Sequence, residues 1–286
     1  MLPASELLTS VSQTDFDFAP IFPDAEPAGE ESGFNLYRAG ELKLGVATRA
    51  VRGDLESAGR QIYRDLFAAT EGRQLYRVWN QVPSINGAGP GGLENYRAFS
   101  AGRSRAFEER FGLGFCGQLP AASGVGTKLP HLTVAFVAGR GPARHFENPH
   151  QLPAYQYPAE HGPRSPSFAR ASAAQWSGKK LIFISGTAAI KGHRTMSPFE
   201  LKGQLACTLD NLGLIGAASG VGPELGAGTQ WNRYFKVYHR FAGDRTAIAA
   251  ALNTSLLVPG DEVVWRETDL CRADLHVEIE ATLVEA

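Results

Sequence analysis

The segment Cys271-Arg272-Ala273-Asp274-Leu275-His276-Val277-Glu278-Ile279-Glu280 decides how the second half of this chain is expected to fold. From Leu275 onward apolar and polar residues alternate, which predicts a β-strand with one face in a core and with Glu278 and Glu280 on the other face. Cys271 lies seven residues before Glu278, and an odd spacing within one extended strand would place them on opposite faces. The two side chains can share a site only if a turn or bulge separates them, and residues 272–274 are a suitable place for it.

The composition is that of an ordinary globular protein. The chain has 286 residues, of which 43% are hydrophobic, enough for one large or two medium domains. A net charge of -1 gives no bulk attraction to nucleic acid or to an anionic membrane, and no apolar run approaches the roughly 20 residues that span a bilayer. The start of the chain lacks the pattern of a signal peptide. The three cysteines, Cys116, Cys207 and Cys271, are widely spaced, so we expect a reducing, cytoplasmic location.

The chain contains two copies of one pattern of elements. In the first copy we expect strands at 42–47, 76–80 and 131–137, and helices at 55–69 and 93–111. In the second we expect strands at 180–186, 234–240, 263–268 and 275–283, and helices at 198–215 and 244–256, with Ser197 and Asp244 as N-caps. Tyr76-Arg77-Val78-Trp79 corresponds to Phe235-Lys236-Val237-Tyr238. The repeat predicts two α+β domains of like fold, each with a sheet backed by two helices.

Two segments fall outside the repeat. Residues 1–32 are rich in proline and are expected to form an irregular N-terminal arm, followed by a first domain at 33–139. Residues 140–177 contain six prolines together with aromatic and basic side chains. That composition differs from a flexible linker, so we expect an ordered connector packed over a site, with the second domain spanning 178–286.

Short motifs in the second half have the order found in one superfamily. They are Ile184-Ser185-Gly186, Leu209-Asp210-Asn211-Leu212, Lys236-Val237-Tyr238 and Val277-Glu278-Ile279-Glu280-Ala281. On these the chain resembles the YjgF/RidA superfamily, which implies two YjgF/RidA-like (chorismate-mutase-like) domains, each a mixed β-sheet backed by two helices. Imine deaminases of that superfamily carry Pro-x-Arg before the penultimate strand. This chain has Pro259-Gly260-Asp261 there, so it lacks the arginine that anchors a deaminase substrate.

Longer irregular motifs match more specifically. They are Tyr76-Arg77-Val78-Trp79-Asn80-Gln81-Val82-Pro83-Ser84-Ile85-Asn86, Phe146-Glu147-Asn148-Pro149, Ala154-Tyr155-Gln156-Tyr157-Pro158 and Gly162-Pro163-Arg164-Ser165-Pro166-Ser167-Phe168-Ala169-Arg170. With the terminal Cys-to-Glu segment, they make the chain similar to the chorismatase family from Phe34 onward. The resemblance implies hydrolysis of the enolpyruvyl ether of chorismate to pyruvate and 3-hydroxybenzoate, in some members with 4-hydroxybenzoate. Other members form a 3,4-dihydroxycyclohexadiene-carboxylate.

The resemblance also implies the catalytic residues. Cleavage of the ether begins with a proton on the enolpyruvyl methylene carbon, so a buried carboxyl that is still protonated near neutral pH suits the task. Glu278 matches the family's catalytic glutamate, and Glu280 would lie on the same strand face. Cys271 lies where the family has a cysteine in 3-hydroxybenzoate-forming members. Its alternative role is that of a small core residue.

A dicarboxylate substrate also needs cations and hydroxyl groups. The candidates that bind it are Arg170, Tyr157, Tyr155, Arg164, Lys236 and Arg240, because arginine in particular binds carboxylates in a bidentate manner. For any single one of these cations the alternative is an ordinary surface charge. Gly186 and Thr187 follow a strand, where a small residue lets the backbone approach a ligand closely.

We expect no metal and no cofactor. The seven histidines show no metal-ligand spacing, and Asn86–Gly92 lacks the spacing of a phosphate-binding loop. The only expected partner is the small-molecule substrate, chorismate, and the expected assembly is a monomer or a homotrimer. The alternatives are a chorismatase that forms the dihydroxylated acid, a non-catalytic YjgF-like protein that binds small carboxylates, and an imine deaminase.

Overall fold

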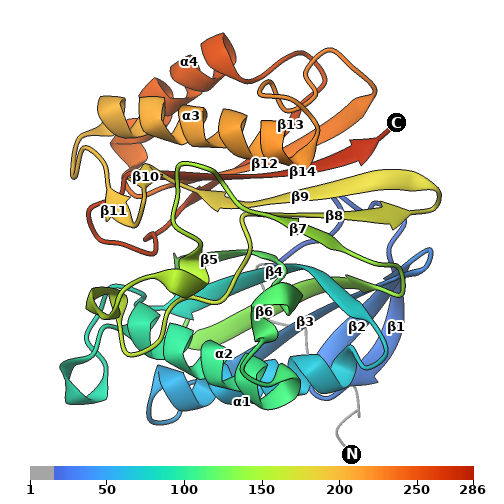
Figure 1. The fold of residues 1–286 in the computed structure, drawn as a ribbon, viewed down its shortest axis with the longest axis vertical. Helices are drawn as coiled ribbons and strands as arrows, with labels where there is room; N and C mark the ends of the chain where they lie inside the picture. Colours follow the sequence, from blue (N-terminus) through green and yellow to red (C-terminus); the bar gives the residue numbers. More distant parts are fainter. Residues whose placement is uncertain (1–15) are drawn as a thin grey trace, which may run out of the picture.

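Two six-stranded sheets face each other in the middle of the molecule, and a pair of helices covers the outer face of each (Figure 1). These features come from a computed structural model that describes residues 16–286. The first sheet has the order β1-β2-β3-β6-β4-β5 and the second the order β13-β12-β14-β9-β8-β7.

The first domain contains β1 (Glu26–Glu31), β2 (Phe34–Ala39), β3 (Leu42–Ala50), α1 (Leu55–Ala69), β4 (Gln74–Pro83), α2 (Asn95–Phe111), β5 (Ala121–Thr127) and β6 (His131–Gly139). The second sheet and its helices comprise β7 (Arg144–Phe146), β8 (Ala171–Trp176), β9 (Lys179–Thr187), α3 (Leu201–Ser219), β12 (Trp231–His239), α4 (Arg245–Ser255), β13 (Glu262–Glu267) and β14 (Val277–Glu285). A small hairpin, β10 (Ile190–Lys191) and β11 (Arg194–Thr195), lies between β9 and α3.

The pairing of the strands confirms the predicted repeat. β4 pairs in parallel with β5 and antiparallel with β6, and β12 pairs in parallel with β13 and antiparallel with β14. The two strands expected to correspond therefore hold the same place in their sheets. The α+β fold class with two like domains is confirmed.

Helix packing follows from the sequence of α1. Leu55, Ile62 and Leu66 fall on one face at helical spacing and are buried against the first sheet and α2. Asp54 caps the helix, because its side chain accepts a hydrogen bond from the Ser57 backbone N–H at 2.7 Å. Gly102 of α2 lets the two helices approach closely, since a Cβ there would lie 2.0 Å from the Glu56 carbonyl oxygen.

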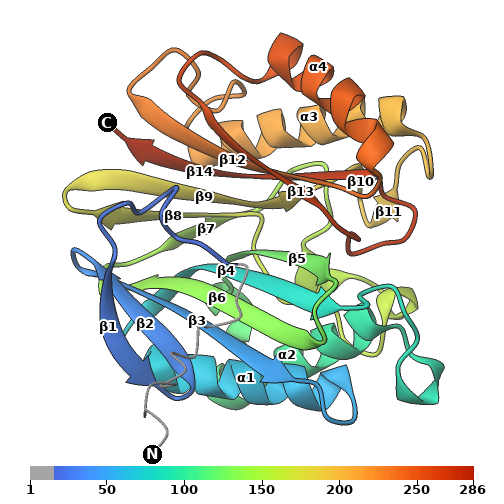
Figure 2. The same ribbon diagram turned by 180° about the vertical axis from the view of Figure 1, so that it is seen from behind.

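A separate core fills the space between the sheets. Tyr76, Trp79 and Val137 of the first sheet pack there with Phe183 and Val284 of the second. The side of this space seen in Figure 2 is bordered by residues 16–25, where Phe18 and Phe22 are buried. The two domains thus share apolar surface, which fixes the inward-facing side chains of β4, β5 and β14 relative to one another.

Several details differ from the sequence predictions. Residues 1–15 of the expected arm lie outside the described residues, but Glu26–Glu31 of that arm is strand β1 rather than irregular chain. All of its residues are exposed, so the strand buries no apolar side chains and shows no alternating pattern. Pro27 is tolerated because β1 is an edge strand. The expected connector contains β7 and β8 of the second sheet, and β8 is hard to detect because it is rich in alanine. The domain boundaries at 33, 140 and 178 stay predictions.

The predicted start of the third helix is wrong. α3 begins at Leu201, with the Glu200 carboxylate accepting hydrogen bonds from the Lys202 and Gly203 N–H groups. Ser197 and Phe199 have positive φ angles of 47° and 59°, so the chain turns where the Ser-Pro pair suggested a helix start. Asp244 precedes α4 without capping it through its side chain, because its carboxylate pairs with His276 Nδ1 at 2.7 Å.

No helix within residues 16–286 is long and apolar enough to cross a membrane.

Candidate active site

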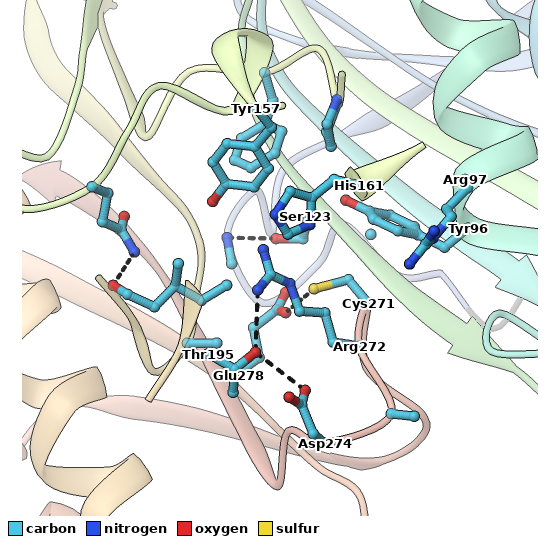
Figure 3. A pocket seen from close by; sticks show the side chains of 18 of the residues that line it. Tyr96, Arg97, Ser123, Tyr157, His161, Thr195, Cys271, Arg272, Asp274 and Glu278 are labelled. Atoms are coloured by element: carbon cyan, nitrogen blue, oxygen red, sulfur yellow. Dashed lines mark hydrogen bonds between the residues drawn. The ribbon is translucent and has the colours of Figure 1, made fainter. Parts of the chain in front are cut away.

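A large cavity lies where the two domains meet the connector, and Figure 3 shows its interior. Its volume is about 610 Å³. Side chains from α2 and β5 of the first domain form one wall, and residues from β9, the small hairpin and residues 271–278 form the other. Tyr157, Phe168 and Arg170 of the connector complete it. A cavity of this size accommodates a small organic acid.

Glu278 lies at the base of this cavity, 3% exposed. On β14 it alternates with Val277 and Ile279, which point into the core beneath α3 and α4, so Glu278 points toward the first domain. Gly186 of β9 leaves the room that its carboxyl occupies, because a Cβ on Gly186 would lie 1.9 Å from Glu278 Oε1. Gly186 therefore serves the glutamate as well as lining the cavity.

Cys271 is brought next to Glu278 by a turn, as the spacing required. Residues 271–274 are bends and turns, and the last strand begins only at Val277. The Cys271 thiol donates a long, weak hydrogen bond to Glu278 Oε2 at 3.8 Å. The predicted turn between the two residues is confirmed. Burial, and then the charge of Glu278, raise the pKa of Cys271 to about 12, so the thiol is neutral at physiological pH.

Glu278 is an acid that holds its proton. Burial raises its pKa to about 8, the neighbouring Glu280 carboxylate adds to the rise, and Arg77 opposes it. A carboxylic acid that stays protonated at neutral pH can deliver its proton to a bound substrate.

Glu280, two residues along the same strand face, is in the opposite state. Burial alone would raise its pKa, but Arg77 and Lys236, together with hydrogen bonds from Ser123 and Trp79, lower it. Its carboxylate accepts hydrogen bonds from Arg77 Nη2 at 2.6 Å, from Ser123 Oγ at 2.5 Å and from Trp79 Nε1 at 2.7 Å. Because these donors come from β4 and β5 of the first domain, the ionised Glu280 ties the two domains together beside the acid.

The cavity also presents cations. Arg103 of α2 is 1% exposed, and none of the described residues hydrogen-bonds to its Nε or Nη2 atoms. Arg170 donates from Nη2 to the Tyr157 hydroxyl at 2.8 Å and leaves Nε without a hydrogen-bond partner among residues 16–286. Buried guanidinium groups with unused donors are costly unless a ligand satisfies them. The arginines that line the cavity are Arg97, Arg103, Arg170, Arg194 and Arg272.

Five of the ten predicted site residues line this cavity: Glu278, Cys271, Arg170, Tyr157 and Gly186. Tyr155, by contrast, packs against the core of the first domain. Arg164 forms an ion pair with Glu108 of α2. Thr187 is buried next to the cavity and donates its hydroxyl proton to the Ser185 carbonyl oxygen at 2.9 Å.

The structure places Lys236 and Arg240, two of the predicted substrate ligands, away from the lining of this cavity. Lys236 Nζ lies 3.7 Å from Glu280 Oε1 and lines a different, smaller cavity of about 170 Å³. Arg240 pairs with Asp269 and donates to the Leu275 and Arg272 carbonyl oxygens, both at 2.8 Å. It therefore holds the segment that carries Cys271. Lys236 lies on β12, whereas Arg240 follows the last residue of that strand, and the carboxylates that both meet belong to the protein.

Several site residues were missed. Arg103 lies on a helix that the sequence pattern identified only as a support for the sheet, and Ser123 lies on a strand that the pattern did not detect. Tyr96 and Arg272 also line the cavity (Figure 3). One sequence signal for Arg103 was available. It lies among small and apolar residues on the side of the helix that faces the core, where an unpaired arginine is unusual.

The fold and this site together define an enzyme built from two α+β domains, with a protonated glutamate buried between them. A family model described as chorismatase FkbO/Hyg5-like, N-terminal, matches residues 23–138. A 3-hydroxybenzoate synthase from Streptomyces hygroscopicus is 34% identical, over 97% of this chain and 84% of the relative. A chorismatase from the same organism is 33% identical, over 95% of this chain and 80% of the relative. The chain belongs to the chorismatase family.

A solved structure agrees with this assignment. A chorismatase crystal structure superposes with a TM-score of 0.80 at 33% identity, covering 90% of this chain and 80% of the other.

Proposed function

We propose that this protein cleaves the enolpyruvyl ether of chorismate and releases pyruvate and 3-hydroxybenzoate. The observation that supports it most is Glu278, a carboxylic acid with a pKa of about 8 at the base of a cavity lined by arginines. The membership of the chorismatase family and the similarity to a 3-hydroxybenzoate synthase support the same reaction. 4-Hydroxybenzoate as a minor product, a cytoplasmic location and the choice between monomer and homotrimer stay predictions.

The cavity has the groups that chorismate requires. Arg103 and Arg170 supply unused buried N–H donors for carboxylates, and Arg272 adds a third cation. Phe168 and Tyr96 offer flat apolar surfaces for the six-membered ring. Fixing both carboxylates orients the enolpyruvyl side chain, and we assign its methylene carbon to the position facing Glu278.

Glu278 starts the reaction by protonating that methylene carbon. The carbon becomes the methyl group of pyruvate, an oxocarbenium ion forms next to it, and the new Glu278 carboxylate stabilises the cation. The ionised Glu280 contributes through its field, because it holds the proton on Glu278 until the substrate is in place.

The atoms of the products constrain the later steps of the reaction. Pyruvate and 3-hydroxybenzoate together contain all the atoms of chorismate, so a water that adds to the cation is released again when the ring loses its 4-hydroxyl group and becomes aromatic. Formation of the dihydroxylated acid instead consumes one water, because the oxygen of the added water goes to pyruvate and the ring keeps its 4-hydroxyl group. The neutral Cys271 thiol lies beside Glu278, and we assign it the role of favouring the aromatic outcome.

Pyruvate release from chorismate tests the function. Purified protein is incubated with chorismate in the presence of EDTA, and pyruvate is followed with lactate dehydrogenase. We expect continuous release, because no step requires a metal. Binding of chorismate without pyruvate would favour the non-catalytic carboxylate-binding protein instead.

The pH profile tests the protonation state of the acid. Glu278 must be protonated to act and has a pKa of about 8, so activity is lost as the pH rises through that value. We expect kcat/KM to be flat near neutrality and to fall ~10-fold per pH unit above about pH 8. A rise in kcat/KM with pH over that range would contradict a Glu278 acid.

A Glu147→Gln variant is the matched control for this profile. Burial raises the pKa of Glu147 to about 7, and its Oε2 lies 4.0 Å from Arg170 Nε, so it is a second group that titrates beside the site. The variant should lose any inflection near pH 7 and keep the fall above pH 8.

A further inference from the structure

We propose that Glu160, His161 and His193 bind one divalent transition metal ion, such as zinc, beside the cavity. Within residues 16–286 they form the one group of three potential ligands whose donor atoms all lie within 4.8 Å of one another. Glu160 and His161 line the cavity, and His193 lies in the turn between strands β10 and β11 of the small hairpin. Sequence spacing concealed the group, because 32 residues separate the two histidines.

The distances suit tetrahedral coordination. His161 Nε2 lies 2.9 Å from His193 Nδ1, and Glu160 Oε1 lies 3.1 Å from His193 Nδ1 and 3.5 Å from His161 Nε2. A tetrahedral zinc ion with bonds of 2.0–2.1 Å needs its ligand atoms about 3.3–3.4 Å apart. Changes of a few tenths of an ångström would convert this triangle into three metal ligands, with a fourth position left for water.

The backbone holds the two sides of the group together. The Leu152 N–H donates to the Gly192 carbonyl oxygen at 2.9 Å, and the Gly192 N–H donates to the His150 carbonyl oxygen at 2.8 Å. Arg272 Nη2 donates to the His193 carbonyl oxygen at 2.9 Å. The connector and the hairpin are therefore fixed to each other before a metal binds, which reduces the entropy that binding costs.

The charges around the group set its affinity. A neutral imidazole is the form that binds a metal. Arg97 and Arg272 repel a dication, while Glu160 attracts it, so we expect micromolar rather than nanomolar affinity.

A bound ion would inhibit the enzyme. Because Glu160 and His161 line the cavity, an ion with a free coordination position there would capture a substrate or product carboxylate away from Glu278. This consequence rests on the proposed function, whereas metal binding itself does not. Without a metal, the same residues form a hydrogen-bonded histidine pair next to an exposed carboxylate.

Calorimetry with zinc chloride alone tests the site. The wild-type protein should bind one ion, and His193→Ala should bind it at least ~10-fold more weakly. His150→Ala removes an exposed histidine outside the group and should leave the affinity unchanged. Cobalt should give the visible absorption of tetrahedral nitrogen and oxygen ligation in a Cys116→Ser background, which removes the exposed thiol.

Absence of zinc binding to the wild type, or equal binding by His193→Ala, would overturn the proposal. Zinc should also reduce chorismate turnover by the wild type, with full recovery in EDTA, and should spare His193→Ala. If the protein does not turn over chorismate, the proposed function fails, and calorimetry still decides the metal site.

Discussion

Replacing Glu278 by glutamine should reduce kcat by about 10²–10⁴-fold while chorismate still binds. The amide has the shape of the protonated carboxyl and fills the same space beside Gly186, but it cannot deliver a proton to carbon. Because the carboxylate-binding arginines are untouched, the loss belongs to the chemical step and not to substrate affinity. Calorimetry for binding and single-turnover pyruvate release for chemistry separate the two.

Glu280→Gln is the comparison variant for this experiment. It leaves Arg77 and Lys236 without their carboxylate, and removing one partner of a buried ion pair typically costs about 3–5 kcal/mol of stability. Its effect on kcat should be milder than that of Glu278→Gln. The pKa of Glu278 should fall, because the repelling charge is gone while Arg77 stays, so the high-pH loss of activity should move to lower pH. If Glu280→Gln abolished turnover and Glu278→Gln did not, Glu280 would be the acid.

Replacing Cys271 by alanine should change the main product from 3-hydroxybenzoate to the dihydroxylated cyclohexadiene acid. The thiol is neutral and lies 3.8 Å from the Glu278 carboxyl, so the proposed reaction places it beside the reacting carbons as a thiol and not as a thiolate. Without the thiol, the ring should keep its 4-hydroxyl group instead of losing it as water. Pyruvate release should persist, because Glu278 still protonates the substrate. Chromatography of the products of both enzymes from one chorismate stock measures the ratio.

Cys207→Ala is the matched control for that experiment. Cys207 is a buried cysteine of α3 in the same apolar cluster that Cys271 packs against, but it does not line the cavity. Its loss should cost stability and leave the product ratio unchanged. If the ratio of 3-hydroxybenzoate to the dihydroxylated acid were unchanged in Cys271→Ala, Cys271 would be only a small core side chain.

The sequence identified Glu278 and Cys271 as candidate site residues, but it did not reveal the groups that shift the pKa values of Glu278 and Glu280. One alternating strand and one turn, both of them local, allowed Glu278 and Cys271 to share a site, and the resemblance to the chorismatase family supplied the roles expected of them. The donors to Glu280 lie about 200 positions earlier, at Arg77 and Trp79, and only the packing of the two sheets brings them near. For the same reason the pattern could not tell that Lys236 would meet a protein carboxylate rather than a substrate carboxylate.

Local signals also set the limits of the fold prediction. The bounds of α1 follow from its apolar spacing and are confirmed, whereas its Asp54 cap was recognised only in the structure. The Ser197-Pro198 pair has the local pattern of a helix start, but Gln204 of α3 donates to the carbonyl oxygens of Ser197 and Asp274, and this tertiary contact accompanies a turn at 197–199. Strand β8 has few β-branched residues and is recognisable only from its pairing with β9.

The full product balance from chorismate tests the central claim most directly. Purified protein is incubated with a known amount of chorismate in EDTA, and chorismate, pyruvate and the aromatic acids are quantified by chromatography. We predict that pyruvate and 3-hydroxybenzoate appear in equal amounts as chorismate disappears, with Glu278→Gln inactive. Chorismate left intact by folded wild-type protein, or pyruvate release that Glu278→Gln retains in full, would contradict the account.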